Sequence, residues 1–177
     1  MFAIGHSTRP IEELVELLQA VRVVTLADVR TIPRSRANPQ FEASALARAL
    51  RAAGIGYAHL PRLGGLRHAR KDSENGAWRN ASFRGYADHM QTPDFEQGLS
   101  ELRALAARGP VAIMCAEAVP WRCHRSLLAD ALAARGVLVR HITGRGRTVP
   151  HRITPFAHIR ARGVTYPAAP AGAAADR

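Results

Sequence analysis

The feature that most constrains this fold is the alternation of short apolar segments with segments of helical character along the chain. The apolar segments have the length and composition of strands buried in a sheet: 2–5, 23–29, 56–60, 111–115 and 137–142. Between them lie the segments with helical periodicity or with helix start and stop residues: 10–20, 42–53, 82–90, 93–108 and about 123–135. This order predicts an α/β fold of three αβα layers, in which helices cover both faces of a mainly parallel sheet of about five strands. The order of the strands stays open.

The length of the chain limits the number of domains. A chain of 177 residues, 47% of them hydrophobic, can build one complete core and is too short for two comfortable ones. We therefore expect a single α/β domain over residues 1–166. Within it, residues 61–81 form a long loop that is a candidate binding segment, and residues 143–166 are predicted to be a basic, loop-like extension. The Ala- and Pro-rich residues 167–177 have nothing to bury and are predicted to be disordered.

The strong positive charge bears on the partner. The formal net charge is +11, and clustered cationic side chains gain affinity for polyanions by releasing counterions. Lys71 is the only lysine among 25 basic residues, so coding bias toward arginine accounts for part of this charge. We expect an anionic small molecule or a nucleic acid as partner. We expect no membrane contact, because no apolar run approaches the roughly 18 residues of a membrane span. The N-terminus lacks a signal-peptide pattern, which predicts a cytoplasmic location, where cysteines stay reduced.

Chemically active residues stand at or just after the predicted strand ends. They are His6, Ser7 and Thr8 after the first strand, Asp28 and Arg30 at the second, Gly64 and Gly65 after the third, Cys115 and Glu117 at the fourth, and His141 at the fifth. The carboxyl ends of parallel strands meet at one edge of a sheet, and ligands of such sheets bind there. Ordinary turn residues would suffice at most of these ends if the function lay elsewhere. The coincidence predicts one shared site.

The segment 111–125, with the sequence VAIMCAEAVPWRCHR, carries the strongest chemical signal. Cys115 stands where a buried strand emerges, and Cys123 stands at the start of the next helix, whose amino end favours anions. Cations alongside are Arg122, His124 and Arg125. Either thiol is therefore a candidate nucleophile, and the alternative is that both cysteines fill core space. No cofactor is expected. No metal is expected either, because the sequence has no CxxC, HxxxH or HExxH pattern.

The pair Asp28 and Arg30 closes an apolar strand, where a buried carboxylate must find a donor. One interpretation is a structural ion pair. In the other, Asp28 orients His6 or a substrate hydroxyl while Arg30 binds an anion. Glu117 can act as a general base or pair with a neighbouring arginine. Further candidates for contact with a phosphate or a base are Arg34, Ser35, Gly64, Gly65 and Trp121.

Five motifs occur in order along the chain: IGHST at 4–8, DVRTIPRS at 28–35, GIGYAHLPRLGG at 54–65, FRGYADHM at 83–90 and MCAEAVPWRCHR at 114–125. The set resembles the domain of unknown function 488 family and spans nearly the whole predicted domain. That family is uncharacterised in its chemistry, so the resemblance implies little about mechanism. It implies these shared positions: His6, Ser7, Asp28, Arg30, Pro33, Ser35, Gly64, Gly65, Cys115, Glu117, Cys123, His124 and Arg125. A looser similarity is to rhodanese and cysteine-phosphatase domains, whose CxxxxxR spacing is not met, because Arg122 is one residue too far from Cys115.

The first functional hypothesis is an enzyme, a cysteine-dependent hydrolase or transferase, that acts on a phosphate-bearing nucleotide or nucleic-acid component. Its catalytic candidates are Cys115, Cys123, His6, Glu117, His124 and Asp28. Its ligand-binding candidates are Ser7, Thr8, Arg30, Arg34, Ser35, Gly64, Gly65, Trp121, Arg122 and Arg125. The second hypothesis is a non-catalytic nucleotide- or nucleic-acid-binding module with residues 140–162 as a basic rail. The third is an interaction protein in which the cluster is only an ion-paired network.

Overall fold

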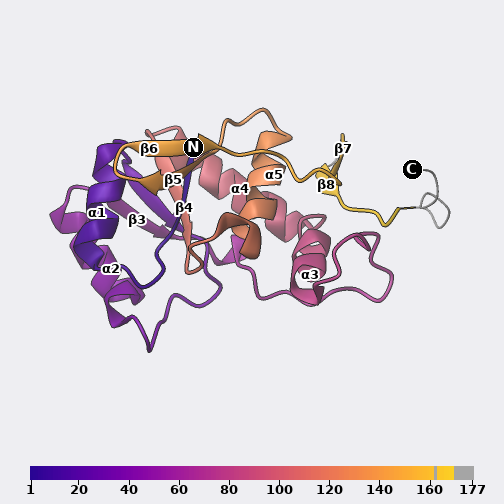
Figure 1. Cartoon of the computed structure of the whole chain (residues 1–177), viewed down its shortest axis with the longest axis horizontal. Helices are drawn as coiled ribbons and strands as arrows, with labels where there is room; N and C mark the ends of the chain where they lie inside the picture. The colour runs from indigo at the N-terminus through magenta and orange to yellow at the C-terminus, as the bar shows by residue number, and fades with distance from the viewer. Residues whose placement is uncertain (162, 170–177) are drawn as a thin grey trace, which may run out of the picture.

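A computed structural model describes residues 1–161 and 163–169 (Figure 1). The centre of the fold is a six-stranded sheet with the order β3-β2-β4-β1-β5-β6. The strands of this sheet are β1 (Phe2–Gly5), β2 (Thr25–Asp28), β3 (Gly56–His59), β4 (Val111–Cys115), β5 (Arg140–Gly144) and β6 (Arg147–Pro150). All neighbouring pairs are parallel except β5 with β6, which is antiparallel. A separate antiparallel hairpin joins β7 (His158–Arg160) and β8 (Gly163–Thr165).

The helices cover both faces of the sheet. They are α1 (Ile11–Ala20), α2 (Ala43–Ala52), α3 (Ala81–His89), α4 (Pro93–Ala106) and α5 (Arg125–Ala133), with short 3-10 turns at Pro39–Phe41, Pro61–Leu63 and Pro120–Arg122. Leu14 of α1 and Leu46 of α2 share one buried cluster with Met114 of β4. Phe95 of α4 and Leu127 of α5 lie in the cluster on the opposite face. The predicted three-layer α/β architecture is therefore confirmed.

Strand β4 is the centre of the sheet and sets the position of the site. All of its residues are buried, and it pairs with β1 on one side and β2 on the other. The register places Gly5 of β1 beside Cys115 of β4, and Asp28 of β2 beside Met114. Because the strands run in the same direction, the segments that follow these residues leave the sheet at one edge.

The C-terminal third differs from the expectation. The sheet has six strands rather than about five, and residues 143–166 are not simply loop-like, because they include the end of β5 and the strands β6, β7 and β8. Strand β6 lies at the edge of the sheet and is mostly exposed, so it needs no apolar face and its short sequence, RTVP, resembles a loop. No helix within residues 1–161 or 163–169 is long and apolar enough to cross a bilayer. Of the tail predicted to be disordered, residues 170–177 lie outside the described residues.

Candidate active site

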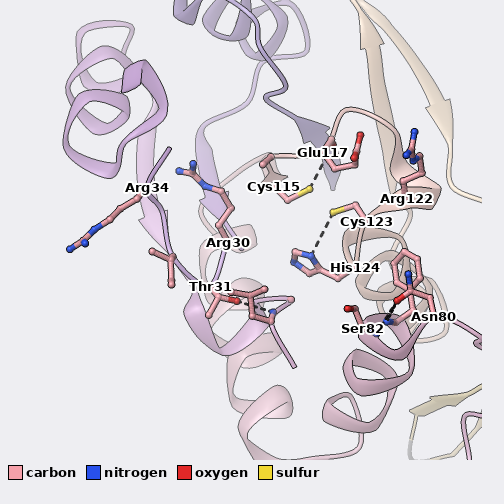
Figure 2. A pocket seen from close by; sticks show the side chains of 15 residues that line it. Arg30, Thr31, Arg34, Asn80, Ser82, Cys115, Glu117, Arg122, Cys123 and His124 are labelled. Atoms are coloured by element: carbon pink, nitrogen blue, oxygen red, sulfur yellow. Dashed lines mark hydrogen bonds between the residues drawn. The ribbon is translucent and has the colours of Figure 1, made fainter. Parts of the chain in front are cut away.

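A cavity of about 480 Å³ lies at the carboxyl edge of the sheet (Figure 2). The loops after β2 and β4 form two sides of it, and the start of α3 forms another. Of the residues predicted from the sequence, those that line it are Arg30, Arg34, Gly65, Cys115, Glu117, Arg122, Cys123 and His124. The described lining residues thus carry three guanidinium groups and one carboxylate. This imbalance favours an anionic ligand.

Cys115 ends β4 and is 2% exposed, with its sulfur facing the cavity side of the sheet edge. Nη1 of Arg125 donates to this sulfur at 2.9 Å. The neighbouring Cys123 thiol, together with Arg125, lowers the pKa of the Cys115 thiol against the opposing effect of burial. Both cysteines are free thiols. The surroundings of Cys115 therefore stabilise its thiolate.

Arg125 explains why a thiolate is stable here. It opens α5, is 1% exposed, and donates from Nη1 to the carbonyl oxygens of Ile4 at 2.6 Å and Glu117 at 3.1 Å. Within residues 1–161 and 163–169, no carboxylate forms an ion pair with it. A buried cation is costly unless an anion compensates it. The Cys115 sulfur is in position to be that anion, although Arg125 itself does not line the cavity.

Cys123 and His124 form a second, neutral pair at the cavity wall. The Cys123 sulfur lies 3.6 Å from Nδ1 of His124, and Nε2 of His124 lies 3.1 Å from the carbonyl oxygen of Val29. The carbonyl requires a hydrogen on Nε2, so Nδ1 holds the lone pair that faces the thiol. Burial lowers the pKa of His124 to about 4, and the neighbouring Cys115 and burial raise the pKa of Cys123. Cys123 therefore stays a thiol at neutral pH.

Asp28 and Arg30 form a buried ion pair that also touches His6. Nε and Nη2 of Arg30 donate to the two carboxylate oxygens of Asp28 at 2.9 and 2.6 Å, and Tyr57 adds a hydroxyl donor at 2.9 Å. Nη1 of Arg30 lies 3.3 Å from Nε2 of His6, whose Nδ1 donates to the carbonyl oxygen of Ser7 at 2.8 Å. Burial lowers the pKa of His6, so its ring is held neutral behind the cavity wall. Of this group only Arg30 lines the cavity.

Gly65 has a steric role beside His124. A Cβ atom at this position would stand 2.4 Å from Nδ1 of His124, closer than side chains approach one another. Gly64 is equally confined, because its Cβ would stand 2.5 Å from the Thr31 hydroxyl oxygen. The glycine pair therefore lets the loop after β3 pass close to the site. Its place in phosphate binding stays a prediction.

Most of the remaining predicted residues lie away from the cavity. The Ser7 backbone has a φ of 53° and its N–H donates to the carbonyl oxygen of Ala116 at 2.9 Å, while Thr8 is exposed. The Ser35 hydroxyl accepts the backbone N–H of Asn38 within its own loop. Trp121 is 74% exposed and faces a different cavity. Glu117 lines the cavity, and its carboxylate accepts the backbone N–H of Val119. The sequence also allowed an ion pair with a neighbouring arginine, and no such pair occurs among the described residues.

One predicted residue, His141, occupies a different position in the fold from the one expected. His141, placed at a strand end by its sequence, is the second residue of β5 and pairs with Ala3 within the sheet.

Sequence reasoning also missed cavity residues such as Thr31, Asn80 and Ser82. The Asn80 side chain accepts backbone N–H groups of Ser82 and Phe83 and so caps α3. An Asn before a helical segment is a recognisable helix start, and this signal could have placed the amino end of α3.

Comparison with known proteins gives one family and no individual relative. No curated protein and no solved structure matches the chain. The looser similarity to rhodanese and cysteine-phosphatase domains stays a prediction. Residues 10–132 match the family described as "Domain of unknown function DUF488", a segment that includes both cysteines but begins after His6. Because this match covers more than half of the 177 residues, the chain belongs to the DUF488 family.

Proposed function

We propose that this protein is a cysteine-dependent hydrolase of a small phosphate monoester, such as a nucleotide, and that Cys115 is the nucleophile. The observation that carries the proposal is the buried Arg125, which donates to the Cys115 sulfur at 2.9 Å and has no carboxylate partner in the described chain. A thiolate is the form of cysteine that attacks electrophiles.

The cavity offers a place for the phosphate in front of this thiolate. Arg34 and Arg122 line it from two different loops and are exposed, so they are available to an incoming anion. Arg30 has two of its nitrogens committed to Asp28, and it serves mainly to fix the loop after β2. Guanidinium groups match the geometry of phosphate oxygens and stabilise the charge of the transition state.

The reaction takes two steps. In the first, the Cys115 sulfur bonds to phosphorus, the bond from phosphorus to the ester oxygen breaks, and that oxygen takes a proton from solvent. In the second, a water oxygen bonds to phosphorus, the sulfur–phosphorus bond breaks, and the thiolate returns as inorganic phosphate leaves. The proton lost by the water goes to solvent. Cys123 stays protonated throughout, with its thiol 3.6 Å from Nδ1 of His124.

The first test measures the ionisation of Cys115 directly. Ultraviolet absorbance of the thiolate, followed against pH in the parent protein, where Cys123 stays protonated, is expected to give a midpoint well below the ordinary value of about 8.5. Arg125→Gln should move this midpoint upward, whereas Arg122→Gln, which alters an exposed cavity arginine that does not contact the sulfur, should move it far less. An ordinary midpoint in the parent protein, or no change in Arg125→Gln, would refute the thiolate.

The second test measures turnover. Release of phosphate from p-nitrophenyl phosphate and from a panel of nucleoside monophosphates is expected to be lost in Cys115→Ser and retained in part in Cys123→Ser. Equal activity of both variants and the parent would exclude covalent catalysis by Cys115.

A second candidate function is the non-catalytic binding module, and the depth of Cys115 is the observation that favours it, since only 2% of this residue is exposed. This function predicts nucleotide binding that weakens with added salt and is unchanged in Cys115→Ser. It also predicts that the parent protein releases no phosphate.

A further inference from the structure

A second cavity, of about 860 Å³, lies on the other side of the loop that follows β4. Ala116 and Glu117 of this loop line the first cavity, while the residues from Ala118 to Trp121 line the second. The walls of the second cavity come from β5, β6, the start of α5 and residues 154–156. Among the described residues, the two cavities have no lining residue in common.

A hydrogen-bonded chain of buried residues ends in the wall of this second cavity. Asp130 is fully buried; its Oδ1 accepts the backbone N–H of Thr154 at 3.0 Å and its Oδ2 accepts the hydroxyl of Tyr166 at 2.8 Å. Oδ1 also lies 2.8 Å from Nε2 of His151, and Nδ1 of His151 lies 3.0 Å from Nε2 of His141. A carboxylate only accepts, so His151 carries a hydrogen on Nε2; with the ring neutral, its Nδ1 accepts from Nε2 of His141.

These hydrogen bonds determine which ring nitrogen of His141 carries the hydrogen. With its hydrogen on Nε2, the neutral ring keeps a lone pair on Nδ1. Burial, with His151 and Arg125 nearby, lowers the pKa of His141 to about 4, so the ring is neutral at physiological pH. His141 is 8% exposed, and its Nδ1 has no hydrogen-bond partner in the described part of the chain. The cavity wall therefore holds an unused acceptor.

Two unused donors belong to the same wall. Nε1 of Trp78 and Nε of Arg125 are buried, and neither finds an acceptor within residues 1–161 and 163–169. Buried polar atoms without partners are rare, because each forfeits the hydrogen bonds it makes in water. All three belong to residues that line one cavity, and a ligand with both donors and acceptors that shifted these side chains slightly would supply the missing bonds.

Charge and aromatic surface narrow the class of ligand. No Asp or Glu occurs among the described lining residues, whereas Arg9, Arg125 and Arg152 do. Arg152 is exposed and forms no ion pair with a described carboxylate, so its charge is free for a ligand. Trp121 is 74% exposed at this cavity, a large aromatic surface in water that a planar ring can cover.

We propose that the second cavity is a binding site for a planar aromatic compound that carries an anionic group, such as a nucleoside monophosphate. The ring stacks on Trp121, the anionic group pairs with Arg152, and an amino or hydroxyl group of the ligand donates to Nδ1 of His141. This site is separate from Cys115 and does not rest on the proposed hydrolase activity.

The test uses adenosine 5′-monophosphate as the probe and isothermal titration calorimetry of the Cys115→Ser protein, in which turnover cannot interfere. Trp121→Ala is expected to weaken binding by about tenfold, the usual effect of losing one stacked base. Arg152→Gln should weaken binding several-fold and flatten its dependence on salt. Arg108→Gln, which alters an exposed arginine that lines neither cavity, is the matched control and should leave this binding unchanged.

Adenosine and ribose 5-phosphate, titrated separately, show which part of the probe is recognised. Weaker binding of both supports the proposal. Ribose 5-phosphate binding as tightly as the whole probe would refute the aromatic class, and loss of binding in Arg34→Gln alone would place the ligand in the first cavity. Absence of any binding to the parent protein would also overturn the proposal. Trp121 and Arg152 are exposed, so their variants keep the test valid even if changes at buried His141 unfold the protein.

Discussion

Replacing Asp28 with Asn tests whether the ion pair under the site is structural. Asp28 is fully buried and accepts hydrogen bonds from the Arg30 side chain, from the Arg30 backbone N–H at 3.1 Å and from the Tyr57 hydroxyl at 2.9 Å. Asn keeps the shape but removes the charge and turns one acceptor into a donor that faces other donors. Arg30, which is 7% exposed, then remains as a buried cation without its counter-charge.

The expected loss follows from this geometry. Removing one member of a buried ion pair costs about 3–5 kcal/mol of unfolding free energy. For a domain of this size, a loss of that order lowers the melting temperature by roughly 6–20 °C. Urea unfolding followed by circular dichroism measures the free energy, and an unchanged m-value shows that the unfolded states are comparable.

The control for this measurement is the exposed ion pair between Asp72 and Arg70. Asp72→Asn should leave stability unchanged within error, because water screens exposed pairs. The double variant Asp28→Asn with Arg30→Gln should recover part of the loss, since no buried charge is left unpaired. A loss in Asp28→Asn of less than about 1 kcal/mol would refute the structural assignment.

The remaining predictions concern other residues in or beside the candidate site. Gly65→Ala should cost about 1–3 kcal/mol in urea unfolding, because the new Cβ would stand 2.4 Å from Nδ1 of His124, whereas Gly54→Ala, with open space around it, tests only backbone strain. Tyr57→Phe should cost about 1 kcal/mol, the worth of its bond to Asp28, and a larger loss would point to another role. The folded pKa of His124 is about 4, below the unfolded value of 6.5, so its contribution is complete above pH 6.5 and is lost as pH falls toward 4. Urea unfolding at pH 7.5 and pH 5 should show this loss, and His124→Gln should reduce it.

The apolar pattern of the sequence predicted the layers of this fold well, because buried strands consist almost entirely of apolar residues. Strand β4 was expected at 111–115 and is found there, since each of its residues is buried. Strand β5 was misplaced by three residues at its start, because Val137 still belongs to the turn that follows α5 and donates its N–H to the carbonyl oxygen of Leu132. Strand β6 was missed because an edge strand needs no apolar residues.

The candidate site could be predicted best where one segment carries several of its residues. The end of β4 and the segment after it supply Cys115, Glu117, Arg122 and Cys123, all of which line the first cavity. In contrast, Asn80 and Ser82 reach the cavity only because the start of α3 packs beside distant loops, which no local pattern encodes. Nor could spacing along the chain show that Arg125, ten positions from Cys115, points back to its sulfur.

The strand order also bears on how the chain reaches its folded state. Strand β1 pairs only with β4 and β5, so Phe2 finds its neighbours Ala112 and Arg140 after most of the chain has been made. Of the early strands, only β2 and β3 can pair with each other soon after synthesis. Contacts of such long sequence separation slow folding and leave strand edges open in the meantime. A chain cut before β4 should therefore aggregate rather than fold, and chaperone demand should be greatest while residues up to about 110 are emerging.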